Sequence, residues 1–387
     1  MSRAARWLIA TAVAASPLHA AEYTAAGRIG INGEHDDNVA LVERGENAIS
    51  GVSLAPALRL GYRTPDLTVS LDTQLNFARF DERDYDSSDQ RMILDVAKQT
   101  PRNELGLQAG GVRDSTRTSE LEDTGRVSRR AVRREDYWLA PSWLTYLSER
   151  NALRFGASFH DVSYGSRTYT DYTTAGVDLT WLHILSPRTT LKLQGYLNRF
   201  DVGDALDTRS DTAGVMAGAD FALTENLKLS ALAGAAKVET RRDLPPSVPF
   251  SRRSNENVTV VDARLDYTQP RWSLSFNVAS QTYPSADGLI QQRRFARAAW
   301  SYRLSELLTL RLGALYGQNE SVERRFRIDR DYADADAGID WRITQSLYLN
   351  ARYRYRFQDY DNAPGDASGN AVFFGIRYEP VPKRWSR

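Results

Sequence analysis

The sequence predicts an all-β protein: a closed antiparallel transmembrane β-barrel of about 18 strands. Three observations predict this fold. Apolar residues recur at every second position along most of the chain, short and long connections alternate strictly between these segments, and each apolar segment is about ten residues long. The mean hydropathy is −0.49, and no apolar run of about 18 residues follows the N-terminus, which excludes a helical membrane protein.

The composition excludes several other classes of protein. The 387-residue chain carries a formal net charge of +1 and no cysteine. It is therefore neither a strongly basic nucleic-acid-binding protein nor a disulfide-stapled mini-domain. Its four histidines (His19, His35, His160 and His183) lack the spacing of zinc ligands, so we expect no metal and no cofactor.

The first 20 residues have the order of a secretory signal peptide. Arg3 and Arg6 form the positive start, residues 7–15 the short apolar stretch, and residues 18–20 a cleavage site with small residues. The alternative is an N-terminal helix of a cytosolic domain. We expect residues 21–387 to form one outer-membrane barrel domain without a linker.

The apolar faces follow one another along the chain. In order, they are Val52, Leu54, Leu58, Leu60 and Tyr62; Leu67, Val69, Leu71, Leu75 and Phe77; Leu153, Phe155, Ala157 and Phe159; Val177, Leu179 and Trp181; Val215, Ala217, Ala219, Phe221 and Leu223; Val261, Ala263, Leu265 and Tyr267; Trp272, Leu274, Phe276 and Val278; Leu308, Leu310, Leu312, Ala314 and Tyr316; Ile339, Trp341 and Ile343; Tyr353, Tyr355 and Phe357; and Val372, Phe374, Ile376 and Tyr378. Strands one, four, five and six are weakly patterned, so 16 strands is the alternative count.

The connections fall into two kinds. Eight are short turns, at residues 63–66, 99–104, 148–152, 186–190, 224–226, 269–271, 305–307 and 344–346; nine are long and polar, at 33–50, 81–90, 114–136, 161–171, 201–211, 239–257, 284–294, 318–330 and 359–370. Outer-membrane barrels have short periplasmic turns and long extracellular loops. A soluble propeller or sandwich, the alternative, has no reason to sort its connections by length.

The opposite parity of each strand is expected to line a water-filled lumen. From the fourteenth strand onward it carries eight basic residues, Arg297, Arg303, Arg311, Arg342, Arg352, Arg354, Arg356 and Arg377, against three acidic ones, Asp334, Asp336 and Asp340. Arg352, Arg354 and Arg356 would stand about 7 Å apart, which suits a polyanion passing several guanidinium groups. Alternatively, the aspartates pair with the arginines across the strands and brace the wall. Both alternatives stay open, and the basic surplus favours anions.

Catalytic and calcium sites have weaker support. His35-Asp36-Asp37 and His160-Asp161 resemble parts of a hydrolase site, but neither has a third member, so we do not expect an enzyme. Asp36, Asp37 and Asn38 suit calcium by ligand type but lack the spacing of a calcium loop, and a solvated acidic turn is the favoured alternative. Residues 245–253 form a proline-containing outer loop that either constricts the lumen or is simply exposed.

Several short motifs resemble a known family. The run Glu34-His35-Asp36-Asp37-Asn38-Val39, the segment at 54–58 and the turns at 146–153 and 185–191 are similar to the β-barrel porin type 2 group. This group includes the EpsL-like outer-membrane proteins of exopolysaccharide (PEP-CTERM-type) gene clusters. The resemblance implies a role in moving surface polysaccharide across the outer membrane. In outline the chain is also similar to the eighteen-stranded alginate-export barrel, although its tail, residues 379–387, departs from the usual terminal aromatic.

We therefore expect a monomeric or trimeric passive barrel in the outer membrane of a Gram-negative bacterium, with a preference for anions. Export of an acidic exopolysaccharide is the leading expected function. The alternatives are a general or anion-selective solute porin and a structural or docking barrel plugged by its own loops. The expected partners are outer-membrane lipid, a polysaccharide or small anionic solute, and periplasmic export components, but no nucleic acid.

Overall fold

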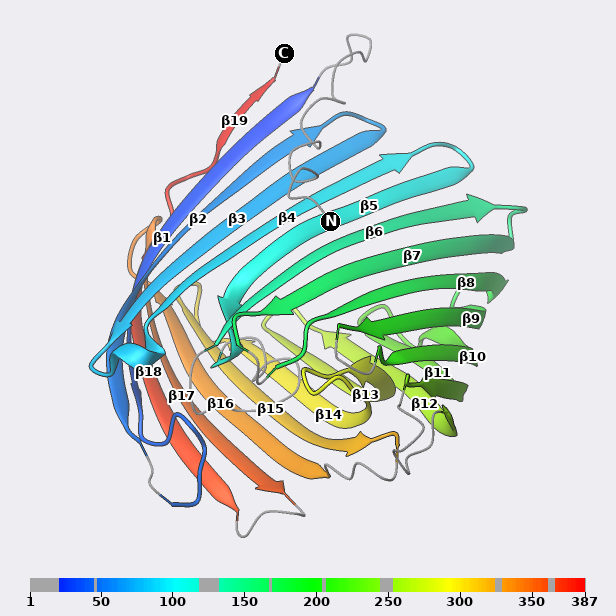
Figure 1. Cartoon of the computed structure of the whole chain (residues 1–387). Coiled ribbons are helices and arrows are strands. Elements are labelled where there is room, and N and C mark those ends of the chain that lie inside the picture. The colour runs from blue at the N-terminus through cyan, green and yellow to red at the C-terminus, as the bar shows by residue number, and fades with distance from the viewer. Residues whose placement is uncertain are drawn as a thin grey trace, which may run out of the picture.

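The computed structural model describes residues 21–44, 47–117, 132–166, 169–203, 207–243, 253–323, 329–360 and 366–386. The predicted signal peptide, residues 1–20, lies outside this range. The described residues form one closed ring of antiparallel strands, with both ends of the ring at the same rim (Figure 1).

The strands are long, with 12 to 16 residues in each strand from β1 to β18. They are β1 (Glu22–Asp36), β2 (Ile49–Arg63), β3 (Leu67–Phe80), β4 (Ser87–Gln99), β5 (Asn103–Ser115), β6 (Arg133–Tyr146), β7 (Asn151–Tyr164), β8 (Tyr172–Ser186), β9 (Thr189–Val202), β10 (Arg209–Ala222), β11 (Leu227–Arg241), β12 (Arg253–Thr268), β13 (Trp272–Pro284), β14 (Ile290–Arg303), β15 (Leu308–Ser321), β16 (Arg330–Arg342), β17 (Leu347–Tyr360), β18 (Ala367–Tyr378) and β19 (Lys383–Ser386), with one short 3₁₀ turn, η1 (Arg83–Tyr85).

The barrel closes between its first and last strands. Each strand from β1 to β17 pairs with the next, and β18 pairs with β1 from Ile29↔Tyr378 to Asp36↔Ala371. Closure satisfies the backbone groups of both edge strands, which hydrocarbon could not do. The predicted antiparallel barrel with 18 strands is confirmed, and the alternative of 16 is wrong.

The C-terminal tail continues the last strand. After Tyr378 the strand is interrupted at residues 379–382, which include two prolines. β19 then pairs with the start of β1 from Glu22↔Ser386 to Ala25↔Lys383. Proline has no N–H for the ladder, which explains the break. Trp385 stacks on Tyr23 with ring centroids 5.7 Å apart. β19 therefore extends the pairing along β1 to the rim where β1 begins.

The outer face of the barrel is apolar. Ile31 and Phe374 expose 57% and 65% of their surface there, although both are large hydrophobic residues. Aromatic pairs lie toward the strand ends, with Tyr267 and Trp272 4.8 Å apart and Trp300 stacked on Tyr302. Both pairs lie at the short-turn ends of their strands. An apolar band bordered there by aromatic residues matches lipid and its interface. The chain is an integral β-barrel of the bacterial outer membrane. No helix in the described ranges has the length and apolarity to cross a membrane.

The connections are sorted as predicted, but the strands are longer. Short connections have two to four residues and long ones five to seventeen. β12 begins at Arg253, inside the stretch predicted to be a loop, and the β1–β2 ladder continues to Asp36↔Ile49. The outer end of β12, residues 253–257, is polar on both faces. The alternation therefore fades in the sequence while the backbone ladder continues, because pairing does not depend on side-chain polarity.

The outer end of one hairpin separates from one of its neighbours and reaches into the lumen. β13 pairs with β12 only from Thr268↔Ser273 to Val261↔Ser280. Beyond Ser280, β13 stays paired with β14, and β14 stays paired with β15 as far as Gln291↔Ser321. At the tip, the carbonyl of Ala286 accepts a 2.9 Å hydrogen bond from the N–H of Thr170, in the β7–β8 connection. The tip therefore reaches from the β13–β14 wall to the β8 side of the ring (Figure 1).

The hairpin rests on an apolar patch inside the barrel. Ala286 and Ile290 pack with buried residues on the inner face of β7–β12: Val162, Tyr164, Tyr172, Phe200, Val202, Met216, Ala236, Val238, Val258 and Val260. The expectation of a polar lumen is therefore wrong for the outer half of these strands. An inward-folded hairpin excludes water from the wall that it covers, so apolar side chains are favoured there. Most of the predicted constriction at 245–253 lies outside the described residues.

Candidate functional site in the lumen

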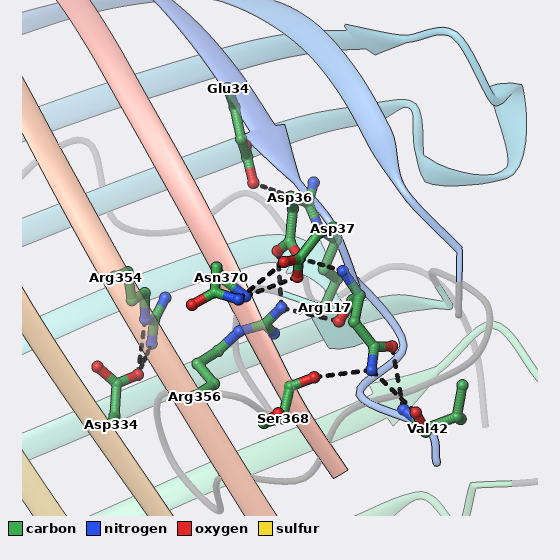
Figure 2. Close-up of polar contacts among 11 residues, drawn as sticks. Glu34, Asp36, Asp37, Val42, Arg117, Asp334, Arg354, Arg356, Ser368 and Asn370 are labelled. Carbon is green, nitrogen blue, oxygen red and sulfur yellow. Dashed lines mark hydrogen bonds and ion pairs between the residues drawn. The ribbon is translucent and has the colours of Figure 1, made fainter. Parts of the chain in front are cut away.

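The first long loop folds into the lumen and fastens onto the last strands. Asp36, only 3% exposed, accepts a 2.7 Å hydrogen bond from Arg356 of β17. The carboxylate of Asp37 accepts bonds from the backbone and side-chain N–H groups of Asn370, at 2.6 and 2.8 Å. The side-chain amide of Asn38 donates to the carbonyls of Val42 and Ser368, both at 2.9 Å. Figure 2 shows these contacts, which we call the clasp.

A third segment joins the clasp. Arg117, after β5, forms an ion pair with Glu34 of β1, and its guanidinium lies over the ring of Phe80, 4.5 Å from the centroid. Glu34 and Asp36 thus face two guanidinium groups from distant parts of the chain (Figure 2). The motif at 34–39 is therefore a buried clasp, and the expectation of a solvated acidic turn is wrong.

The other interpretations of the acidic and histidine motifs find no support in the geometry. His35 lies on the outer parity with Nδ1 2.8 Å from Ser50 Oγ, whereas its neighbour Asp36 faces inward. His160 contacts Asp136 at 3.3 Å, and Asp161 lies on the opposite face of β7. Across the described ranges no three His, Cys, Asp or Glu side chains gather in a way that could hold a metal ion.

A pocket of about 640 Å³ lies beside the clasp, inside the barrel. Strands β13–β17 form its walls, and Leu41 of the first loop contributes to its rim. Its polar and aromatic lining consists of Asn277, Gln281, Arg293, Phe295, Arg297, Tyr332, Asp334, Asp336, Arg354, Arg356 and Phe357. The pocket has the size of a small-molecule site and carries both signs of charge.

Most of the charges around this pocket are already engaged. Arg354 donates to Asp334 at 2.6 Å, and Arg356 is held by Asp36. Arg293 donates to the hydroxyl of Tyr332 at 2.8 Å. Arg297 differs, because it has no ion pair with any described residue. It is therefore the pocket cation available to an incoming anion, with the carboxylate of Asp336 and the amides of Asn277 and Gln281 as polar neighbours.

All eight predicted lumen arginines lie on the inward parity, but they do not form an open stripe. Four have carboxylate partners: Arg311 with Asp340, Arg354 with Asp334, Arg356 with Asp36, and Arg377 with Glu379. Arg352 lies 4.4 Å above the ring of Phe373, and Arg342 donates to the carbonyl of Glu306. Within the described ranges, Arg297 and Arg303 are the two of these eight that have no ion pair, no side-chain hydrogen bond and no stacking contact.

The contacts of Arg352, Arg354 and Arg356 on β17 test the two open interpretations, a row of free guanidinium groups and arginines paired with aspartates. Its three guanidinium groups contact an aromatic ring, an aspartate of β16 and an aspartate of β1, respectively. Of the three aspartates on β16, Asp334 pairs with this row through Arg354, Asp340 pairs instead with Arg311 of β15, and Asp336 has no ion pair among the described residues. The expected pairing is therefore found for one pair, and the three guanidinium groups still do not form a free row. Anion binding by these eight arginines stays a prediction.

Sequence reasoning missed Leu41, Arg117, Arg293 and Tyr332. Leu41 and Arg117 lie in connections between strands, and the local sequence does not predict where such a connection runs. Arg293 falls within the predicted outer loop at 284–294, yet it shares the inward parity of Arg297, four residues further along β14. Extending that alternation outward could have found it.

Comparisons with known proteins concern the fold. No family model and no curated protein matches this sequence. Among solved structures, the FrpB iron transporter from Neisseria meningitidis (F3-3 variant) is similar with a TM-score of 0.50 and 11% identity, over 94% of this chain and 82% of that chain. Pseudomonas aeruginosa OccK2 (OpdF) in complex with glucuronate has a TM-score of 0.49 and 12% identity, over 93% and 98%. P. aeruginosa OpdK with vanillate has a TM-score of 0.46 and 10% identity, over 93% and 99%.

Proposed function

We propose that the protein is a passive outer-membrane porin that selects small anionic solutes at the lumen pocket beside Arg297. The observation that carries this proposal is a guanidinium without an ion pair among the described residues, in a pocket of about 640 Å³. Arginine side chains in a pore are a common means of anion selectivity, and the guanidinium fork suits a carboxylate. Asp336, Asn277 and Gln281 would accept or donate hydrogen bonds to the rest of a hydroxylated acid.

The geometry favours a solute porin over exopolysaccharide export. The inward hairpin and the clasp both occupy lumen space at the outer half of the barrel, whereas a polymer needs a continuous path of its own width. Export, and with it the EpsL-like kinship and the periplasmic partners, remains a prediction from the sequence resemblance. A barrel plugged by its own hairpin is the second candidate, favoured by the Thr170–Ala286 bond across the lumen.

Planar-bilayer recording tests the proposal. We expect an anion-selective current that glucuronate, used as a monomeric sugar acid, blocks from either side. Replacing Arg297 by glutamine should weaken the block by about 10- to 100-fold, because a charge-assisted hydrogen bond is worth roughly 1.5–3 kcal/mol and about 1.4 kcal/mol corresponds to a factor of ten.

The matched control is Arg303→Gln. Arg303 lies on the same strand, also without an ion pair among the described residues, but outside the pocket lining. It should leave the block nearly unchanged. Equal effects of the two variants would contradict the pocket, and the complete absence of current in the wild type would favour the plugged barrel.

A further inference from the structure

A groove of about 700 Å³ lies on the membrane face of the barrel, across β7–β12. Its lipid-facing lining consists of Phe155, Val177, Leu179, Gly195, Leu197, Ala213, Val215, Ala235, Lys237 and Asn257. Apart from the last two, these side chains are apolar or absent. The groove is therefore a depression in a surface that is otherwise in contact with acyl chains.

The register explains the shape of the groove. Gly195 lies between Leu179 of β8 and Val215 of β10, and Ala235 follows Val215 in the same row. A Cβ added at Gly195 would meet no atom within 4 Å, so the depression is open at that point. Leu197 and Val215, 59% and 58% exposed, rise beside it. Small residues form the floor, and larger aliphatic residues form the sides.

The groove ends at a cation near the outer rim. Lys237 lies four residues from the outer end of β11, between Ala213 and Asn257 in the ladder. It has no ion pair among the described residues. Phe155, at the other end of the groove, lies four residues from Asn151, the end of β7 at the short turn. The groove thus runs from the middle of the barrel wall to the level of the outer-leaflet head groups.

The charged residues above Lys237 are already paired with one another. On the outward face, Arg199 contacts Asp211 at 2.8 Å and Arg209 contacts Asp201 at 2.5 Å, while Glu239 accepts from both Arg241 and Arg253. With Lys237, the outward outer ends of β9–β12 carry five basic and three acidic side chains. The surplus is positive, and Lys237 is the cation without a described partner.

We propose that this groove binds a phosphorylated, acylated lipid of the outer leaflet, with an acyl chain over Gly195 and a head-group phosphate at Lys237. The apolar groove suits the chain, because each buried methylene group contributes about 0.8 kcal/mol. The compact ammonium group of lysine suits phosphate, and the positive surplus around it is complementary to an anionic head group. This site lies outside the lumen and is independent of the proposed transport function.

Native mass spectrometry of the purified barrel with lipid A, a bisphosphorylated acylated lipid, tests the proposal. We expect one tightly retained lipid A molecule. Gly195→Leu places a side chain in the groove, and its Cβ meets no atom within 4 Å, so the variant should reduce retention at least several-fold. The control is Gly27→Leu, because Gly27 also lies on the outward face and its added Cβ also meets nothing within 4 Å.

The head-group contact has its own pair of variants. Lys237→Gln should lower the retention of lipid A by the barrel. It should also abolish the preference of the barrel for lipid A over the dephosphorylated lipid. Lys98→Gln, at an outward lysine close to the opposite rim, should not. Heat-dependent gel mobility verifies that each variant is folded. The proposal is overturned if Gly195→Leu and Gly27→Leu behave alike, or if Lys237→Gln leaves the preference for phosphate intact.

Discussion

Replacing Arg356 by methionine is expected to destabilise the barrel by about 3–5 kcal/mol, because breaking a buried ion pair leaves a charge without compensation. The side chains of Arg356 and Asp36 are 4% and 5% exposed, so water cannot replace the lost guanidinium. Arg356 also donates to the carbonyl of Asn38 at 3.1 Å. The variant therefore loosens the first loop as well as the ion pair.

The measurement is the urea midpoint of unfolding from lipid vesicles, followed by tryptophan fluorescence. Arg352→Met is the matched control: it makes the same change on the same strand, but this guanidinium lies over Phe373 and has no ion pair among the described residues. Adding Asp36→Asn to Arg356→Met should recover part of the loss, because the buried charge is then removed. If the two single variants unfold at the same urea concentration, the clasp does not stabilise the barrel as described.

Replacing Ala286 by aspartate is expected to raise the single-channel conductance several-fold. Ala286 is 2% exposed and packs within the apolar cluster under the hairpin. An ionised carboxylate buried there without a partner would cost several kcal/mol. The hairpin can avoid that cost by leaving the inner face of β7–β12, which exposes the aspartate to water and widens the path through the lumen.

A cross-link distinguishes release of the hairpin from damage to the wall. The chain has no cysteine, and a Cβ added at Gly288 lies 3.8 Å from the Cβ of Thr170. That spacing is typical of a disulfide, about 3.8 Å. Gly288 has a φ of 72°, where an L side chain is strained, so the oxidised pair is compared with the same pair reduced. In the Ala286→Asp background, the pair Thr170→Cys and Gly288→Cys should suppress the conductance increase when oxidised and restore it when reduced. Unchanged conductance in Ala286→Asp itself would show that the hairpin does not limit the current.

The alternation of side chains predicted the wall of the barrel well. Val52, Leu54 and Leu58 do face lipid, while Arg59 faces the lumen and pairs with Asp72 at 2.7 Å. This success has a local cause, since successive side chains in a strand point to opposite faces. The prediction failed at the outer strand ends for two reasons. Both faces are polar at the outer end of β12, and the inner face of β7–β12 is apolar under the hairpin, as at Val202 and Val238.

The clasp could be predicted only in part. The run at 34–39 stood out in the sequence, but its function did not, because Asp36 and its partner Arg356 are 320 residues apart. No sequence pattern around Asp36 or Arg356 indicates that the two residues are partners. They meet because β1 pairs with β18 when the ring closes, and β17 lies beside β18.

The sequence by itself therefore determined which side chains face lipid and which face the lumen, including the inward parity of all eight arginines, because the strand pleat is a property of neighbouring residues. Only the tertiary structure decided which of those arginines remain available. Ring closure brings Asp36 to Arg356, and the inward turn of the β13–β14 hairpin depends on apolar surface contributed by six other strands. Charge neutralisation and lumen shape both arise from contacts between residues far apart in the chain, and a local pattern carries no information about them.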